Sequence, residues 1–268
     1  MSTELPLPEQ PVVMDVPGWQ GIHPGIPDTP QRRKLHRQRD VREIVFGAKD
    51  GILTTMGVVT GVGAASGDHG TVAIAGLLAL IAGALSMGVG QYQGTKSERE
   101  VVRSSIEQEK AEMAAHPQDE FAEQVAYYKL KGFSADEAHL IVNRLVRNPE
   151  IYLYEMVRDE FGIDPRIADD SDVRPAFAIA GSYAVGSFLP VVPFIPALSP
   201  LVALVASGVL ALLGLFGIGF YAGSMTTRNP WKRGLEIVLW GSGVFAISFL
   251  AGRFIPPLLG HAFVPIGG

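Results

Sequence analysis

The chain has 268 residues, of which 47% are hydrophobic and only 18% are charged, and its formal net charge is −5. This composition, with a positive mean hydropathy of +0.23, is more apolar than that of an ordinary soluble domain. Cysteine is absent from the sequence, which excludes disulfides and thiolate metal sites. Basic residues are not interleaved with aromatic ones, so the sequence gives no indication of nucleic-acid binding.

Residues 1–38 form a proline-rich stretch that predicts a disordered tail, without the basic start and apolar core of a signal peptide. Long apolar blocks then follow, each close to the roughly 20 residues that a helix needs to cross about 30 Å of hydrocarbon. They lie at residues 44–67, 71–94, 175–196, 198–223 and 235–256. Polar residues do not recur in them every three to four positions, which argues against a soluble bundle. The sequence therefore predicts an all-α membrane protein with five transmembrane helices.

Basic residues mark one side of this arrangement. They occur in "RRKLHRQRDVR" before the first block, between blocks two and three, and in "TTRNPWKR" between blocks four and five. The remaining connections, "SGDHG" and "PALSP", and the end "HAFVPIGG" carry no Lys or Arg. By the positive-inside rule, the N-terminus is predicted to be cytoplasmic and the C-terminus non-cytoplasmic.

The segment between blocks two and three is long enough to form a domain. Residues 95–165 contain 15 acidic and 9 basic side chains together with periodic apolar positions, which predict a helical cytoplasmic insert. The predicted organisation is a tail at 1–38, two membrane helices in 39–94, the insert at 95–171, three membrane helices in 172–258 and a non-cytoplasmic tail at 259–268. Within the insert, Ser134 and Glu137 predict a capping box, and Pro149 and Gly162 predict the two ends of the last helix.

Carboxylates occur in pairs on the first two helices of the insert. Glu109 and Glu112 are three residues apart, as are Glu120 and Glu123, so each pair lies on one helical face. Their mutual repulsion becomes useful if a divalent cation sits between the helices, because oxygen ligands suit Fe²⁺, Mn²⁺ and similar ions. Glu160, on the fourth helix, would complete such a site. The alternative is an ordinary solvated acidic face, and spacing does not exclude it.

A second candidate carboxylate lies in the first apolar block. An acidic residue in a membrane span is costly and is by default a functional hypothesis, so Asp50 is expected to face protein or water. Lys49 is an alternative partner for it, although neighbouring residues on a helix point about 100° apart.

Several segments together resemble the vacuolar iron transporter family. These are "REIVFGAKDG", "GALSMGVGQYQGTKSERE", the acidic insert, "GSYAVGSFLPVVPFIP" and "TTRNPWKRGLEIVLWG", in this order from about residue 40 to residue 256. The resemblance implies a homodimer of five-helix protomers that exchanges Fe²⁺, Mn²⁺ or other divalent ions for protons. The expected member is of the bacterial type.

The resemblance also assigns residues. It implies that Asp50, Glu43 and Met87 line the transport pathway. It implies that the insert binds the metal through Glu109, Glu112, Glu120, Glu123, Met156 and Glu160. The sequence departs from the pattern of plant and fungal-type members at Ala79 and Gly83, where the resemblance implies a glutamate and a methionine, and at Val157, where a second methionine is expected.

The sequence thus predicts a proton-coupled exporter of Fe²⁺ or Mn²⁺ from the cytosol, with Zn²⁺ and Co²⁺ as further candidate ions and no permanently bound cofactor. The expected membrane is the bacterial inner membrane, or a vacuolar-type membrane in a eukaryote. One alternative is a membrane-anchored metal sensor or buffer. Another is a membrane-bound di-iron enzyme, which is disfavoured because an acid-x-x-His element, Asp136 with His139, occurs once rather than twice.

Overall fold

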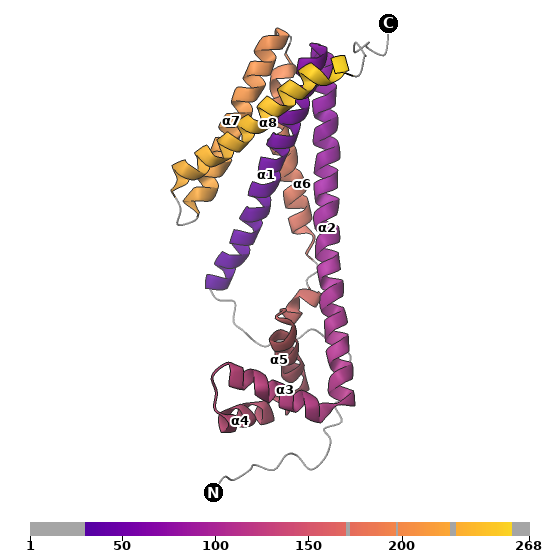
Figure 1. Cartoon of the computed structure of the whole chain (residues 1–268), viewed down its shortest axis with the longest axis vertical. Helices are drawn as coiled ribbons and strands as arrows, with labels where there is room; N and C mark the ends of the chain where they lie inside the picture. The colour runs from indigo at the N-terminus through magenta and orange to yellow at the C-terminus, as the bar shows by residue number, and fades with distance from the viewer. Residues whose placement is uncertain (1–29, 170–171, 197, 226–228, 259–268) are drawn as a thin grey trace. The chain divides into compact units, whose positions relative to one another are not determined.

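The computed structural model describes residues 30–169, 172–196, 198–225 and 229–258, with side chains from residue 41 onward. The regular structure in this part of the chain is entirely helical (Figure 1). The chain forms two compact units. One is built around residues 94–171, and we call it the insert unit; the other, the membrane unit, combines residues 29–93 with residues 172–268.

The membrane unit contains the long helices. They are α1 (Pro30–Ser66), the first part of α2 (His69–Ala115), α6 (Arg174–Val191) with the short 3₁₀ helix η2 (Val192–Phe194), α7 (Pro200–Ser224) and α8 (Pro230–Leu258). Each of the five predicted apolar blocks lies largely within one of these helices, but α1 begins well before its block and α2 extends well beyond its own. Four of the described helices are long and apolar enough to cross a membrane: α2, α6 with η2, α7 and α8. The sequence predicts five spans, and α1 does not meet the same criterion, since Lys49, Asp50 and several Thr and Gly residues lower its hydropathy. The fifth span therefore stays a prediction.

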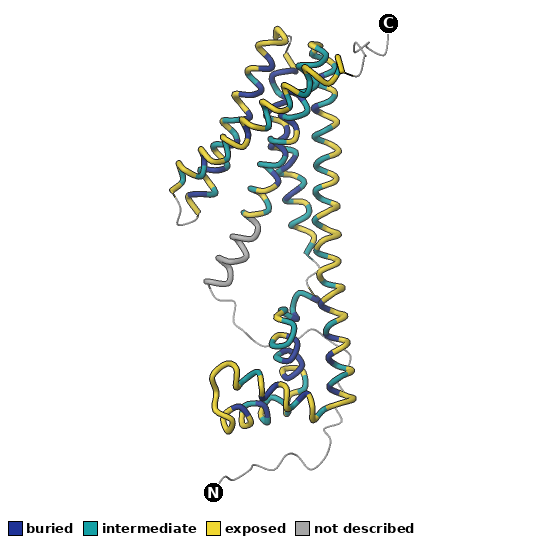
Figure 2. The backbone as a smooth tube through the Cα atoms, in the orientation of Figure 1, coloured by how far each residue is buried: buried dark blue, intermediate teal, exposed yellow. Residues whose placement is uncertain are grey.

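α1 is nevertheless packed inside the membrane unit. Its Ile52, Met56 and Val59 are fully buried, in clusters shared with α7 and with α6 and η2. Glycines allow close helix approach: a Cβ built on Gly186 of α6 would lie 2.2 Å from the carbonyl oxygen of Ala48. Figure 2 shows buried positions along α1, α6 and α7, whereas much of α2 and α8 is exposed.

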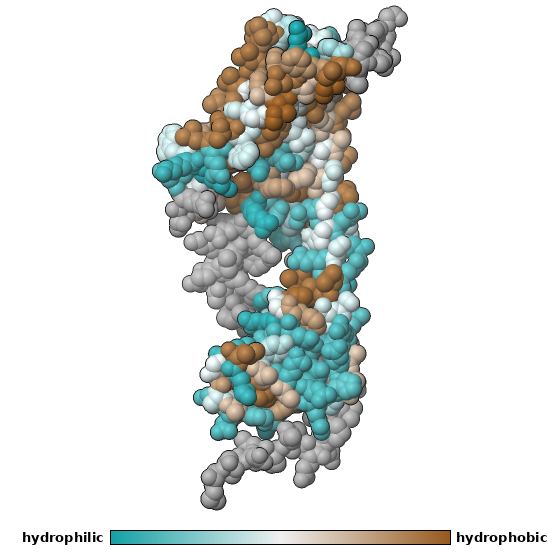
Figure 3. All heavy atoms as spheres, viewed as in Figure 1, coloured by the Kyte–Doolittle hydropathy of each residue, from teal (hydrophilic) through white to brown (hydrophobic). Residues whose placement is uncertain are grey.

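The exposed faces of the two units differ in chemistry. In Figure 3 the visible surface of α7 and α8 is mostly hydrophobic, and the visible surface of the insert unit is mostly hydrophilic. Exposed apolar side chains on α8 include Leu239, Trp240 and Ile247, all more than two-thirds accessible. Such faces are stable only against lipid or protein, so the chain is an integral membrane protein.

The insert unit begins with the second half of α2. It continues through α3 (Pro117–Leu130), α4 (Ala135–Leu145), α5 (Pro149–Phe161) and the 3₁₀ helix η1 (Pro165–Asp169). The predicted capping box is present, with the Ser134 hydroxyl accepting from the Glu137 amide and the Glu137 carboxylate accepting from the Ser134 amide. A compact apolar core, including Val102, Ile106 and Leu153, joins α2 to α5.

Candidate metal-binding site and pathway residues

Local sequence fixes the helix that carries the last carboxylate. Pro149 stands in the first turn of α5, where its missing N–H costs nothing, and the Asn148 side chain accepts from the Ile151 amide at 3.3 Å. The helix stops at Gly162, whose φ of 65° is left-handed. Glu160 thus lies in the last turn of α5.

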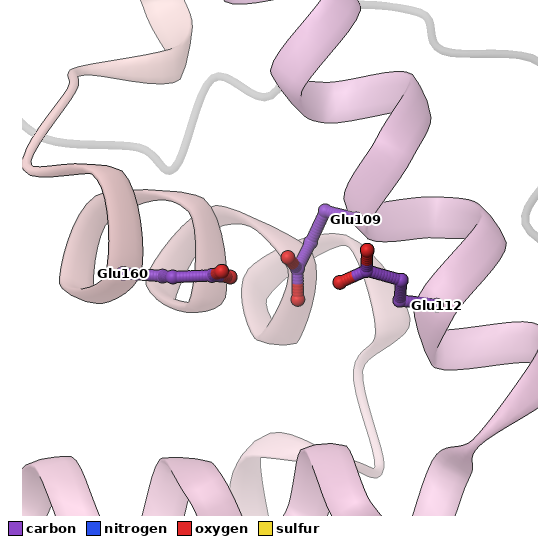
Figure 4. Close-up of side chains that lie close together, drawn as sticks. All are labelled: Glu109, Glu112 and Glu160. Atoms are coloured by element: carbon purple, nitrogen blue, oxygen red, sulfur yellow. The ribbon is translucent and has the colours of Figure 1, made fainter.

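Three carboxylates meet in the insert unit. Glu109 and Glu112 project from α2 and Glu160 projects from α5, and one oxygen from each lies within 4.8 Å of the others. Figure 4 shows the Glu109 carboxylate between the other two. Glu112 also accepts a hydrogen bond from the Gln108 amide at 3.1 Å. The structure therefore joins two helices whose carboxylates are about fifty residues apart in the sequence.

Glu109 is the unusual member of this group. It is fully buried, and neither of its carboxylate oxygens has a hydrogen-bond partner among the described residues. Burial first of all, and then the neighbouring Glu160, Glu120 and Glu112 carboxyls, together raise the pKa of Glu109 from 4.5 to about 9. At neutral pH the metal-free site therefore keeps a proton on Glu109, which relieves the repulsion among the three groups.

The second predicted pair, on α3, is placed differently. Glu120 is 6% exposed with one unpartnered oxygen, and its pKa is raised by burial and then by the charges of Glu123, Glu112 and Glu160. Glu123 is exposed and accepts a hydrogen bond from the Tyr127 hydroxyl at 3.2 Å. Neither Glu120 nor Glu123 belongs to the close group of three carboxylates. The charge of Glu120 nevertheless raises the pKa of Glu109.

The predicted sulfur ligand lies in the apolar core. Met156 is fully buried and packs in the same cluster as Met113, which is one turn after Glu109 on α2. Val157, where a second methionine was expected, is fully buried there too. A β-branched apolar residue at this position strengthens the core and offers no ligand.

Sequence reasoning missed several polar residues beside the carboxylates. The Tyr152 hydroxyl is buried without a hydrogen-bond partner among the described residues, and its pKa is raised by burial and by the charges of Glu120, Glu109 and Glu123. Gln124 is also fully buried, and its amide donates to Asp159 at 2.8 Å, tying α3 to α5. Periodicity could indicate that these residues are buried, but not that they adjoin the acidic group.

The predicted pathway residues lie in the membrane unit. Glu43 and Asp50 are on α1, Met87 is on α2, and all three are partly buried. Asp50 forms no ion pair with a described residue, so the proposed pairing with Lys49 does not occur. Instead, the Lys49 ammonium lies 5.4 Å from the centre of the Phe46 ring.

The departure at Gly83 has a structural explanation. A Cβ at this position would lie 2.1 Å from the hydroxyl oxygen of Tyr183, a residue of α6 that is only 2% exposed. The tyrosine side chain therefore occupies the space beside α2 that a residue larger than glycine would need. Met87 is one turn further along α2, so Tyr183 brings a phenol close to the same face. For Ala79, which is partly buried, the structure supplies no comparable partner.

The chemistry of the insert group suits a divalent cation. Three carboxylates supply hard oxygen ligands, and a divalent cation held by Glu109, Glu112 and Glu160 would give the buried Glu109 carboxylate a counter-charge. No histidine takes part in the group that the described residues form, which is unlike the acid-x-x-His pattern of di-iron bundles.

Comparison with known proteins gives the family. The chain is 32% identical over 218 residues to Vacuolar iron transporter 1 of Arabidopsis thaliana, which covers 80% of this chain and 86% of the relative. It is 30% identical over 240 residues to Vacuolar iron transporter 1 of Eucalyptus grandis, covering 85% and 94% of the two chains. Protein CCC1 of Saccharomyces cerevisiae is 26% identical over 231 residues, covering 83% and 70%. Residues 41–253 match the VIT family, and the chain belongs to that family.

Proposed function

We propose that this protein exports Fe²⁺ or Mn²⁺ from the cytosol in exchange for protons, and that the insert unit captures the ion first. The group of Glu109, Glu112 and Glu160 carries this proposal, because two acidic side chains converge on a third, Glu109, whose oxygens have no hydrogen-bond partner among the described residues. Names of similar proteins support iron as the ion. Glu120, Glu123 and Met156 are proposed as further metal ligands, reached after small movements of α3 and α5.

The membrane half of the proposal rests on Asp50. An ionised carboxylate facing lipid would cost several kcal/mol, so a partly buried aspartate that pairs with no charged side chain of the described residues is expected to serve the transported ion. Met87 adds a thioether, which favours transition metals over Mg²⁺ and Ca²⁺. Because the Asp50 carboxylate can bind either a metal ion or a proton, it would couple metal export to proton entry. Glu43, earlier on the same helix, would bind the ion before Asp50.

The proposed assembly is a homodimer of five-span protomers in which α1 is the fifth span. In each protomer, the proposed location of the N-terminus and the insert unit is cytoplasmic, and that of the C-terminus is non-cytoplasmic. Ion binding on the cytoplasmic side then implies export, across a bacterial inner membrane or into a vacuole-like compartment.

Transport is tested by flux across a sealed bilayer. Proteoliposomes holding the full chain are expected to accumulate Fe²⁺ and Mn²⁺ under an imposed pH gradient, and competition with Zn²⁺ and Co²⁺ ranks the ions. Asp50→Asn is expected to abolish proton-coupled uptake, whereas Asp68→Asn, in the exposed α1–α2 connection, should not. Metal binding without any flux would instead indicate a membrane-anchored sensor or buffer.

Capture by the insert unit is tested separately by calorimetry on the full chain. Glu109→Gln and the double variant Glu120→Ala/Glu123→Ala are expected to lose the tighter class of bound ions while keeping the helix content. Glu98→Gln, an exposed glutamate earlier on α2, serves as the control. Unchanged binding in Glu109→Gln would remove the insert site from the mechanism.

A further inference from the structure

A cavity of about 780 Å³ lies in the membrane unit, where α1 meets the end of α7 and the start of α8. Its walls come from residues 41, 42, 45, 46, 49 and 53 of α1, from residues 222 and 225, and from residues 233, 236, 237 and 240 of α8. Neither Asp50 nor Glu43 lines it, so it is distinct from the proposed pathway residues. Its volume is in the range of small-molecule binding sites.

The charge at the cavity is positive. Arg42, Lys49 and Arg233 line it, and the lining carboxylate is Glu236. Arg233 donates to Glu236 at 3.0 Å, so these two charges compensate each other. Arg42 and Lys49 form no ion pair with a carboxylate of the described residues, and Lys49 rests over the Phe46 ring. The uncompensated charges of Arg42 and Lys49 therefore favour an anionic ligand in this cavity.

The rest of the wall is apolar and accessible. Eight of the twelve lining residues are hydrophobic; among them, Phe46 is 47% exposed and Trp240 is 71% exposed. Tryptophan and basic residues together are typical of the level at which a membrane helix meets the lipid headgroups. A ligand that matches both features has a negative head and an apolar chain.

We propose that this cavity binds an anionic phospholipid, with the headgroup phosphate between Arg42 and Lys49 and the first part of an acyl chain against Phe46 and Trp240. Basic pockets between transmembrane helices bind acidic headgroups in this way. A soluble phosphate would leave the apolar wall exposed, and a zwitterionic lipid would leave the two charges uncompensated. The lipid would link α1, next to Asp50, to α8.

Cross-linking identifies the occupant. The full chain with a photoreactive benzoylphenylalanine in place of Trp240 is reconstituted in nanodiscs of phosphatidylcholine, with or without phosphatidylglycerol. The proposal expects lipid adducts that are predominantly phosphatidylglycerol. Adducts to a second copy of the chain or to its own residues 1–29 would overturn it, as would equal labelling of the two lipids.

Charge removal tests the headgroup contact. Phosphatidylglycerol retained by the purified protein is counted by native mass spectrometry. In Arg42→Ala/Lys49→Ala, retention is expected to fall roughly thirtyfold, in line with the contribution of two basic residues near a membrane surface. The control Lys232→Ala/Arg253→Ala removes two positive charges of α8 that do not line the cavity. An equal fall in the control would show general surface attraction and would contradict a specific site, and the cross-linking result stands even if the double variant does not fold.

Discussion

Glu109 is fully buried, and its carboxyl group would have to lose its proton to bind a metal ion as proposed. Its pKa of about 9 in the metal-free protein means that the folded state keeps a proton which the unfolded chain loses above its ordinary pKa of 4.5. The stability that this group contributes is complete below pH 4.5 and is lost as the pH rises toward 9. A bound cation reverses this balance by favouring the ionised form.

Metal affinity of the insert unit should therefore rise with pH. Between pH 6 and 8, where Glu109 is protonated without metal, each ion bound is expected to release about one proton, and affinity should increase up to about tenfold per pH unit. Calorimetry of the full chain in buffers of different ionisation enthalpy measures the proton count. Glu98→Gln should keep this behaviour, and affinity independent of pH in the native protein would refute the role of Glu109.

Gly83 and Tyr183 are predicted to be energetically coupled. Gly83→Ala places a methyl group against the phenol ring and should destabilise the protein by about 1–3 kcal/mol through overpacking. Gly90→Ala on the same helix meets nothing within 4 Å and should cost little. Thermal unfolding in detergent measures both.

The coupling is isolated by adding Tyr183→Ala to Gly83→Ala. The double variant should lose less stability than the two single variants lose together, because without the Tyr183 ring the methyl group at position 83 meets no clash. Strict additivity would show that the two positions do not share this space.

At the scale of elements, α5 links the acidic group to the core of the insert unit. Its buried face holds Met156 and Val157, and Glu160 in its last turn faces α2. The helix is short, with 13 residues, so its end signals matter for its stability.

Loss of the α5 cap should therefore loosen this helix. Asn148→Ala removes the acceptor for the Ile151 amide and should cost about 1 kcal/mol, which corresponds to roughly fivefold faster amide exchange if α5 opens locally. Hydrogen exchange of residues 149–161 in the full chain provides the measurement. Asn148→Ser keeps a capping oxygen and should restore protection; equal exchange in both variants would mean that the cap contributes nothing.

For the whole molecule, the number of membrane spans depends on α1. It is less apolar than the other long helices, yet its centre is buried against α6, α7 and α8. A helix whose polar groups face protein can cross a membrane without the hydropathy of a lipid-facing span.

We expect α1 to cross the membrane, and the cysteine-free sequence makes this simple to test. Thr29→Cys and Ser97→Cys should react with an impermeant maleimide from one face of sealed vesicles, and Asp68→Cys from the other. Reaction of Thr29→Cys and Asp68→Cys from the same face would leave four spans and place the two chain ends on the same side.

The sequence by itself determined the local features of this protein. Apolar blocks of membrane length, the capping box at Ser134 and the ends of α5 at Pro149 and Gly162 all appear in the structure close to their predicted positions. These signals depend on neighbours within one or two helical turns, so they are visible in a single chain.

Only the tertiary structure decided which of the candidate residues meet. Helical spacing paired Glu120 with Glu123 as readily as Glu109 with Glu112, but packing of α5 on α2 brought Glu160 to Glu109 and Glu112 and buried Glu109. In the same way, the glycine at position 83 is explained by a tyrosine one hundred residues later. Contacts between distant helices depend on the complementary shapes of their faces, and the periodicity of one segment contains no information about its partner.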